Sequence, residues 1–275
     1  MPTSHRSGLV PAGTGHPRVR PFLNIKHNRA PNPRRAVALE GTWTVRAALA
    51  ASVPVEVVFV CPSLLRGDEA TNVITQVRDS GGLAFEVSDR VLGRMVDRDG
   101  PDGLAAIAHM PAGVLADIPL GGRTRVVVAD ALELAGNLGT VIRCADGAGT
   151  AGVVLTESRV RVTHALVVKA SMGTLFSTPV VEAHRPQALQ WLRRHGFFVV
   201  AADPDAGVSY RDVAYPRRVA IVMGSERYGL APFWKEAADV SVAIPMLGVA
   251  DSLNVGHAAA LLLYEALHHQ RPERG

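Results

Sequence analysis

Three loops of this 275-residue chain combine glycines with side chains that could bind and polarise a small molecule. The first, residues 134–143, brings the amide of Asn137 and the fixed cation of Arg143 to one predicted helix start. The second, residues 223–229, follows an apolar strand and carries the carboxylate of Glu226. Because glycine has no side chain, both loops let the backbone approach a ligand closely. These residue types in these places indicate a ligand site.

The third loop, residues 244–254, joins a short predicted strand to a buried helix. Pro245 ends the strand, because its ring nitrogen cannot donate to a ladder. From Leu253 onward apolar residues recur at helical spacing, and we expect Ser252 to be the N-cap of this helix. A plain core helix would need Ser252 only as an N-cap, and an N-cap does not explain why Asn254 follows two residues later. A simple cap and a ligand-binding loop both stay open at this point.

Several other kinds of site are not indicated by the sequence. It contains neither the G-x-G-x-x-G fingerprint of dinucleotide-binding proteins nor the G-x-x-x-x-G-K-[ST] phosphate loop, which argues against an oxidoreductase. Cys61 and Cys144 each lie in an apolar stretch without a second Cys or a His at ligand spacing. We therefore expect two core thiols, with no disulfide and no metal site.

Long apolar strands alternate with helices over residues 123–275, where all three loops lie. Such near-continuous apolar runs are typical of strands that are covered on both faces of a parallel sheet. The predicted strands are residues 125–130, 152–155, 196–202, 219–223 and 240–244, and the predicted helices are residues 140–149, 164–172, 186–195, 233–238 and a last one from 252. This pattern predicts a doubly wound α/β domain whose ligands bind at the carboxyl ends of the strands.

A smaller α/β domain is predicted over residues 36–110, followed by a linker over residues 111–122 that is rich in proline and glycine. No catalytic set is found in this domain, and Glu40 is interpreted as a strand-end carboxylate, so we expect a binding or positioning module. Its predicted strands are residues 37–41, 53–61, 83–87 and 103–109, and its predicted helices are residues 45–51, 70–79 and 90–96.

Positive charge is concentrated at the N-terminus. Residues 1–39 contain seven Arg or Lys and no acidic residue, although the net charge of the chain is only +4. Because residues 1–35 are also rich in Pro, Gly and Ser, we expect a flexible basic arm that contacts nucleic-acid phosphates, the alternative being a solvated tail without a partner. No apolar run reaches the ~20 residues of a membrane span, so a soluble cytoplasmic protein is expected.

Taken together, the three loops resemble the motifs of the SpoU family of RNA 2′-O-ribose methyltransferases. The matching stretches are Asn137-Leu-Gly-Thr-Val-Ile-Arg143, residues 222–230, Ile244-Pro-Met246 and Ser252-Leu253-Asn254, together with residues 170–179. The resemblance covers about residues 124–268, with Ala135 where the family commonly has proline. Residues 36–110 are similar to the ribosomal-protein-like RNA-binding module that often precedes this domain.

The resemblance implies a trefoil-knotted SPOUT domain, against the general rule that chains avoid knots, and a homodimer. It also implies S-adenosylmethionine as cofactor, held by Ala202, Gly224, Ile244, Met246, Ser252, Leu253 and Asn254. Arg143 is expected to stabilise charge at the ribose oxygen rather than act as a base, because a guanidinium does not readily lose its proton. Asn137, Glu226, Ser252 and Asn254 would orient Arg143 and the ribose.

For the substrate, the resemblance implies ribosomal RNA, above all 23S rRNA, because a basic arm and an RNA-binding module precede the catalytic domain. The high Ala, Arg, Gly and Val content is similar to that of the avilamycin- and thiostrepton-resistance methyltransferases of actinomycetes, so antibiotic resistance is a further expectation. A tRNA 2′-O-methyltransferase and a non-catalytic RNA- or ribosome-binding protein on the same fold are the alternatives. The five polar site residues argue against a pure binding protein.

Overall fold

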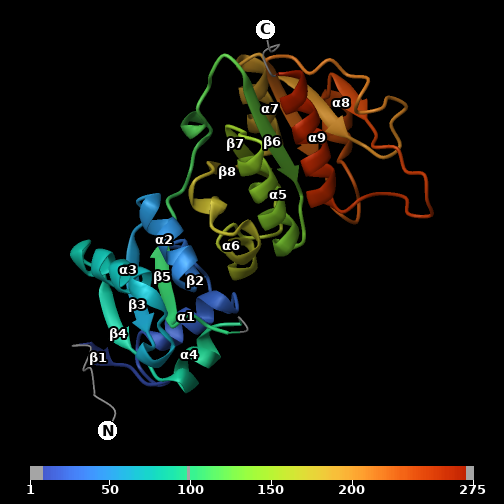
Figure 1. Cartoon of the computed structure of the whole chain (residues 1–275). Coiled ribbons are helices and arrows are strands. Elements are labelled where there is room, and N and C mark those ends of the chain that lie inside the picture. Colours follow the sequence, from blue (N-terminus) through green and yellow to red (C-terminus); the bar gives the residue numbers. More distant parts are fainter. Residues whose placement is uncertain (1–8, 98–99, 271–275) are drawn as a thin grey trace. The chain divides into compact units, whose positions relative to one another are not determined.

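The chain forms two compact α/β units in a computed structural model that describes residues 9–97 and 100–270. Unit 1 comprises Met1–Pro111 and Thr163–Phe176, and unit 2 comprises Ala112–Val162 and Ser177–Gly275 (Figure 1). Each unit has its own sheet. Among the residues described, no helix has the length and apolar character needed to cross a membrane.

The sheet of unit 1 has five strands in the order β1-β4-β3-β5-β2. The first three are mutually parallel, whereas β5 runs antiparallel to both β3 and β2. The strands are β1 (Val10–Pro11), β2 (Ala36–Glu40), β3 (Val55–Val60), β4 (Leu83–Glu86) and β5 (Leu104–His109). The alternation of strands and helices predicted for residues 36–110 is present.

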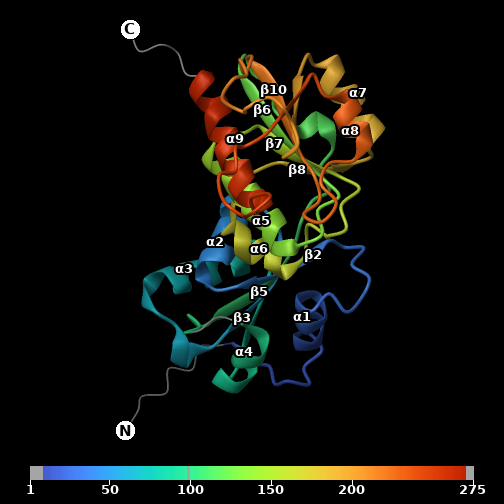
Figure 2. The ribbon, with the colours of Figure 1, turned by 90° about the vertical axis from the view of Figure 1, so that its right-hand side faces the viewer.

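Helices cover both faces of this sheet. Figure 2 shows α2 and α3 on one side and α1 on the other. Phe22 of α1 and Leu92 of α4 share one core cluster with Phe59 of β3, while α2 and α3 pack against each other and against the same strand. The helices are α1 (Val19–Lys26), α2 (Thr42–Ala50), α3 (Gly67–Asp79) and α4 (Asp89–Met95), with a 3₁₀ turn η1 (Pro62–Leu64).

The prediction of a flexible arm over residues 1–35 is wrong for residues 9–35. Strand β1 pairs with β4, and α1 buries Val19 and Phe22 completely in the core of unit 1. Most of the proline and glycine that suggested mobility lies in the turns on either side of α1, and Pro21 lies in its first turn, so composition masks a short amphipathic helix that buries Val19, Phe22 and Lys26. Residues 1–8 of the expected arm lie outside the described residues.

The sheet of unit 2 has six strands, all parallel, in the order β11-β9-β10-β6-β7-β8. The parallel α/β prediction is therefore confirmed. The strands are β6 (Thr124–Asp130), β7 (Gly152–Thr156), β8 (Val180–Ala183), β9 (Phe198–Ala202), β10 (Arg218–Met223) and β11 (Val240–Val242). Strand β8 was not predicted, because four residues after a proline give too short a pattern.

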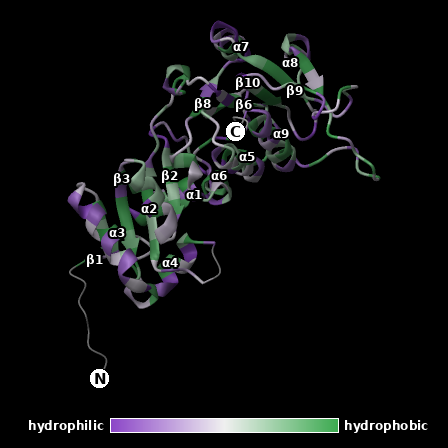
Figure 3. Ribbon diagram, turned by 45° about the horizontal axis from the view of Figure 1, so that its top comes forward, coloured by the Kyte–Doolittle hydropathy of each residue, from purple (hydrophilic) through white to green (hydrophobic). Residues whose placement is uncertain are grey.

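Two pairs of helices cover this sheet, and its strands are largely coloured as hydrophobic in Figure 3. Helices α7 and α8 share a core cluster with Val126 and Val128 through Leu192 and Trp234. Helices α5 and α9 pack against each other and contact β6 and β10; α9 and α7 lie on opposite sides of the strands (Figure 2). The helices are α5 (Ala135–Gly147), α7 (Arg185–Arg194), α8 (Pro232–Ala237) and α9 (Val255–His269), with η2 at Leu115–Asp117.

Helix α6 (Ala165–Ser171) and the turn η3 (Thr174–Phe176) were expected to belong to the domain of residues 123–275. In the structure they belong to unit 1 instead. The indole Nε1 of Trp43 donates to the Met172 carbonyl at 2.9 Å. Gly173, with φ of 85°, lies so close to α2 that a Cβ there would be 2.8 Å from the Ala47 Cβ. The segment that resembled a family motif thus fastens to the N-terminal unit.

Candidate functional site

The carboxyl ends of β6 and β10 lie next to each other, with Met223 opposite Ala129. The chain continues from β6 to β7 on one side, while β10 adjoins β6 on the other, so the strand order reverses at this pair. Ligands of doubly wound sheets bind in the crevice outside such a reversal point. The first and second predicted loops both start here.

One residue from each of the three loops joins a continuous chain of hydrogen bonds, here called the relay. Asn137 Nδ2 donates to Glu226 Oε1 at 2.8 Å, and Asn254 Nδ2 donates to Asn137 Oδ1 at 3.0 Å. The Asn254 Oδ1 in turn accepts from the Gly256 N–H at 2.9 Å. The structure therefore brings together three of the predicted site residues, which are 89 and 117 positions apart along the chain.

Glu226 holds the first loop through its backbone as well as through Asn137. Its two carboxylate oxygens also accept from the N–H groups of Glu133 at 3.0 Å and Leu134 at 3.3 Å. With three donors in place, this carboxylate is an anchor for the loop rather than a free base. Because Glu226 can only accept, it fixes the Asn137 amide with its nitrogen toward Glu226 and its oxygen toward Asn254.

The second loop closes on itself around Ser225, which sequence analysis missed. Ser225 and Gly229 exchange two backbone hydrogen bonds of 3.0 and 2.9 Å, and the buried Ser225 hydroxyl accepts from two further N–H groups of the turn. A Cβ at Gly224 would lie 2.3 Å from the Gly229 carbonyl. The backbone that approaches Gly224 closely thus belongs to the same loop. The sequence signal that could have identified Ser225 is a serine in a turn, because its hydroxyl can accept from the N–H groups two and three residues later.

The third loop differs from the expectation at Ser252. Helix α9 begins at Val255, and its N-cap is Asn254, because the short amide side chain reaches the Gly256 N–H. Ser252 is exposed and donates to Asp251 Oδ1 at 3.3 Å. The start of α9 is also fixed by Gly256, where a Cβ would lie 2.5 Å from Thr140 Cγ2 of α5. Ser252 is therefore outside the relay.

The backbone N–H groups of residues 244–253 make no hydrogen bond to another described residue. The side chains of Leu247 and Val249 are fully exposed, and Ile244 and Met246 are half-buried. Free backbone donors beside unpartnered apolar side chains suit a ligand with a planar heterocycle and polar edges. This loop therefore fits an adenosine-containing cofactor. Leu253 lies at its end, and Ala202 lies opposite Val242 at the end of β9.

Arg143 lies on α5 but outside the relay. It follows Asn137 by six residues, which places the two side chains about 120° apart around the helix. Arg143 is exposed and makes no hydrogen bond or ion pair with any residue that the structure describes. The half-buried thiol of the neighbouring Cys144 has its pKa raised by burial, and Arg143 opposes that shift. The guanidinium is thus available to a ligand.

The β6–α5 connection is further supported by the end of β7. Asp130 is fully buried and accepts from Thr156 Oγ1 and Arg185 Nε, both at 2.8 Å. This hydrogen bond with Asp130 raises the pKa of Arg185. Ala131 N–H donates to the Thr156 carbonyl at 2.7 Å. Sequence analysis missed this ion pair, because its members are 55 residues apart and each is an ordinary charged residue by itself.

Comparison with known proteins places this domain in a family. The profile of the SpoU rRNA Methylase family matches residues 124–264. A Bacillus subtilis 23S rRNA (guanosine(2553)-2′-O)-methyltransferase is 30% identical over 68% of this chain and 73% of its own length. A Streptomyces azureus 23S rRNA (adenosine(1067)-2′-O)-methyltransferase is 32% identical over 53% of this chain and 55% of its own, so the chain spans about half of that relative.

The similarity to solved structures extends over both units. The AdoMet-bound rRNA methyltransferase from Sinorhizobium meliloti superposes with a TM-score of 0.85 at 29% identity, covering 96% of this chain and 98% of that one. The family match covers half of the chain and includes all three loops at the strand ends. The chain belongs to the SpoU rRNA methylase family.

Proposed function

We propose that the chain is an S-adenosylmethionine-dependent methyltransferase that acts on a ribose 2′-oxygen in ribosomal RNA, 23S rRNA above all. The observation that carries the proposal is the relay at the carboxyl ends of β6 and β10, which joins residues of all three motif loops. The names of the B. subtilis and S. azureus relatives support the reaction and the substrate. RNA rather than DNA follows from the hydroxyl itself, which DNA lacks.

The cofactor would supply an electrophilic methyl group. Backbone groups of residues 244–253 would bind its polar edges, and Ile244, Met246 and Leu253 would contact its adenine ring. The backbone around Gly224 closes the second loop and leaves Glu226 facing the first loop. The complete proposed set is Ala202, Gly224, Ile244, Met246, Ser252, Leu253 and Asn254.

Arg143 is proposed to stabilise the negative charge that develops on the 2′-oxygen. Its guanidinium is exposed and unpaired among the described residues, so no ion pair has to break before it binds substrate. A guanidinium keeps its proton at neutral pH, which disfavours a role as general base. Asn137 would orient the ribose through an amide whose direction is fixed at both ends by the relay.

A trefoil knot and a homodimer complete the proposed architecture. After β10 the chain crosses to the far side of β9 to form β11, and α9 then returns to pack against α5 and β10, which supports a threaded C-terminal segment. The outer face of α9 carries the exposed side chains of Leu261 and Tyr264. Burial of this face against a second copy would remove apolar surface from water. Sedimentation at several concentrations tests the dimer.

Unit 1 is proposed to bind RNA and to present it to unit 2. Its own sheet and core support a module with a surface of its own, and residues 163–176, which lie between the two stretches of unit 2 along the chain, belong to this module. Methylation of ribosomal RNA would place the enzyme in the cytoplasm. Antibiotic resistance is the proposed consequence to test by expression in a host that is sensitive to ribosome-targeting drugs, where raised tolerance is expected.

The substrate is tested by incubating the protein with S-adenosylmethionine carrying a labelled methyl group and, separately, 23S rRNA, 16S rRNA and bulk tRNA. Label in 23S rRNA at one nucleotide is expected. Label confined to tRNA would replace the substrate by the tRNA alternative. A folded protein that binds RNA but transfers no label to any of the three would overturn the catalytic proposal in favour of a binding protein.

A further inference from the structure

Several cations of the N-terminal segment form ion pairs within unit 1, which its composition did not indicate. Lys26 is buried and pairs with Asp97 at 2.7 Å and Glu40 at 3.7 Å, so it stabilises the fold. Arg18 and Arg34 both pair with Glu56 of β3. A uniform basic arm is therefore replaced by separate sites with different partners.

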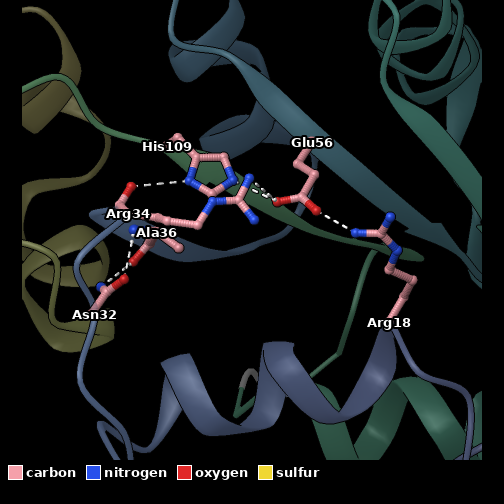
Figure 4. A network of polar contacts seen from close by, with 6 residues as sticks. All are labelled: Arg18, Asn32, Arg34, Ala36, Glu56 and His109. Carbon is pink, nitrogen blue, oxygen red and sulfur yellow. Dashed lines mark hydrogen bonds and ion pairs between the residues drawn. The ribbon is translucent and has the colours of Figure 1, made fainter.

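Figure 4 shows the Glu56 cluster, which consists of Arg18, Arg34, Glu56 and His109. Arg18, the residue before α1, reaches the carboxylate from one side, and Arg34 reaches it from the other side with Nη2 at 3.5 Å. The ring of His109, at the end of β5, contacts Glu56 Oε2 through Nε2 at 2.5 Å and the Arg34 carbonyl through Nδ1 at 3.1 Å. Three basic side chains thus surround one carboxylate.

The cluster keeps a positive excess. The hydrogen bond from His109 lowers the pKa of Glu56 despite an opposing effect of burial, and the nearby arginines lower it further, so this carboxylate is ionised and accepts. The Arg34 carbonyl can only accept as well. Each ring nitrogen of His109 thus faces an acceptor oxygen. Two guanidiniums outweigh a single carboxylate.

Both arginines are held in place while still open to solvent. The side chain of Arg34 is 72% exposed and that of Arg18 is 42% exposed, whereas Glu56 is 23% exposed. Each guanidinium has several N–H donors, and only some of them face Glu56. Because the carboxylate already fixes the two side chains, an anion that binds their outer edges loses less side-chain entropy on ordering them.

We propose that the Glu56 cluster is a binding site for RNA backbone phosphate, in which Arg18 and Arg34 contact the phosphate and Glu56 and His109 position them. The proposal rests on the proposed function, which supplies RNA as the ligand. The two arginines approach Glu56 from opposite sides (Figure 4), and both are exposed to solvent, which suits a polyanion that crosses the cluster.

A merely structural cluster, which fastens α1 and the following loop to the sheet, makes a different prediction. Removing Arg34 would then change thermal stability and leave RNA affinity untouched. Arg34 is the better probe of the two arginines, because its exposed side chain makes only a 3.5 Å contact with Glu56. Arg20 of α1 is a matched control, since it is an exposed cation of the same segment without an ion pair to a described residue.

The experiment measures the affinity of the full chain for a 23S rRNA fragment at several salt concentrations. For Arg34→Ala we expect a roughly 3- to 10-fold loss of affinity near 0.15 M salt and a log–log salt slope that is smaller by about one. Arg34→Lys should keep the slope, and Arg20→Ala should change affinity less than about twofold. Turnover of the control Arg20→Ala at saturating RNA should stay at the wild-type value, because Arg20 lies outside the Glu56 cluster.

Two outcomes overturn the site and distinguish it from the function. If wild type and Arg34→Ala methylate RNA and share one affinity and one salt slope, the Glu56 cluster is not a phosphate site, while the proposed function stands. If Arg20→Ala loses as much affinity as Arg34→Ala, binding depends on the charge of the whole segment and the cluster has no special part. A wild-type chain that neither binds nor methylates RNA overturns the proposed function itself.

Discussion

Two carboxylates, Glu226 in unit 2 and Glu56 in unit 1, organise the polar side chains around them in opposite ways. Glu226 is satisfied by neutral donors, namely two backbone N–H groups and the Asn137 amide. Glu56 is satisfied by the guanidiniums of Arg18 and Arg34 and by the ring of His109. The first arrangement fixes a loop, and Arg143 of the following helix is unpaired among the described residues. The second holds cations in position and keeps part of each one open. The same side chain thus builds a rigid loop in one unit and a charged surface in the other.

The largest effect is expected at Gly224, where the rigid-loop description of unit 2 is most easily broken. Gly224→Val should lower the free energy of unfolding by at least about 2 kcal/mol and abolish methyl transfer, because the new side chain would collide with the Gly229–Leu230 backbone. Gly248→Ala is the control, since nothing lies within 4 Å of a Cβ there. Urea denaturation of both variants is the measurement, and equal stability would refute the close approach at Gly224.

Arg143 should show the next largest effect. Arg143→Ala should lower turnover by at least ~10²-fold while stability and cofactor affinity stay near wild type, because this side chain is exposed and unpaired among the described residues. Arg143→Lys should restore little, since a point charge does not reproduce the planar fork. Single-turnover kinetics and calorimetry with S-adenosylmethionine measure the two quantities. Near-normal turnover of Arg143→Ala would remove Arg143 from the catalytic set.

The same isosteric change in both units sharpens the comparison directly. Glu226→Gln should lower turnover roughly 10-fold, because an amide nitrogen would face N–H donors that now meet a carboxylate. Glu56→Gln should leave turnover at saturating RNA unchanged, since Glu56 belongs to unit 1, which is proposed to bind RNA. Methylation assays at saturating substrates compare the pair. Equal losses in the two variants would contradict the separate roles of the two carboxylates.

The smallest effect is expected in acid, where protonation of Glu56 should lower the free energy of unfolding. Its pKa in the folded state is lowered, first of all by the hydrogen bond from His109. The carboxylate therefore stabilises the fold fully above its ordinary value of 4.5, and this contribution is lost as the pH falls through the lower folded value. Denaturation of wild type and Glu56→Gln at pH 7, 5 and 3 tests this. The stability difference between them should shrink toward pH 3, and a constant difference would argue against the shift.

How much the sequence predicts differs between the two units for a physical reason. Asn137, Glu226 and Asn254 were predicted because each follows an apolar strand in a glycine-containing loop, and parallel strands bring such loops to one edge. Ser252 was wrongly chosen as the cap, since spacing alone does not distinguish it from Asn254. Asp130 with Arg185 was missed, because pairing across 55 residues leaves no local pattern.

In unit 1 the same limit explains the wrong arm prediction. Composition averaged over residues 1–35 hid a helix of eight residues, whose burial depends on a sheet built from residues further along the chain. The Glu56 cluster joins side chains 38 and 53 positions from Glu56. Charge density was visible in the sequence, but the partner of each charge was not. Local patterns predict elements and loops, whereas ion pairs between distant segments require the fold.

The chemical identity of the methylated product is the most direct measurement. Wild-type protein is incubated with 23S rRNA and S-adenosylmethionine carrying a labelled methyl group, and the RNA is then digested to nucleosides and separated by chromatography. We predict label in a single 2′-O-methylated nucleoside, a phosphodiester that resists alkali at that position, and loss of both in Arg143→Ala. Label on a nucleobase, with alkaline cleavage unchanged, would contradict ribose methylation by this site.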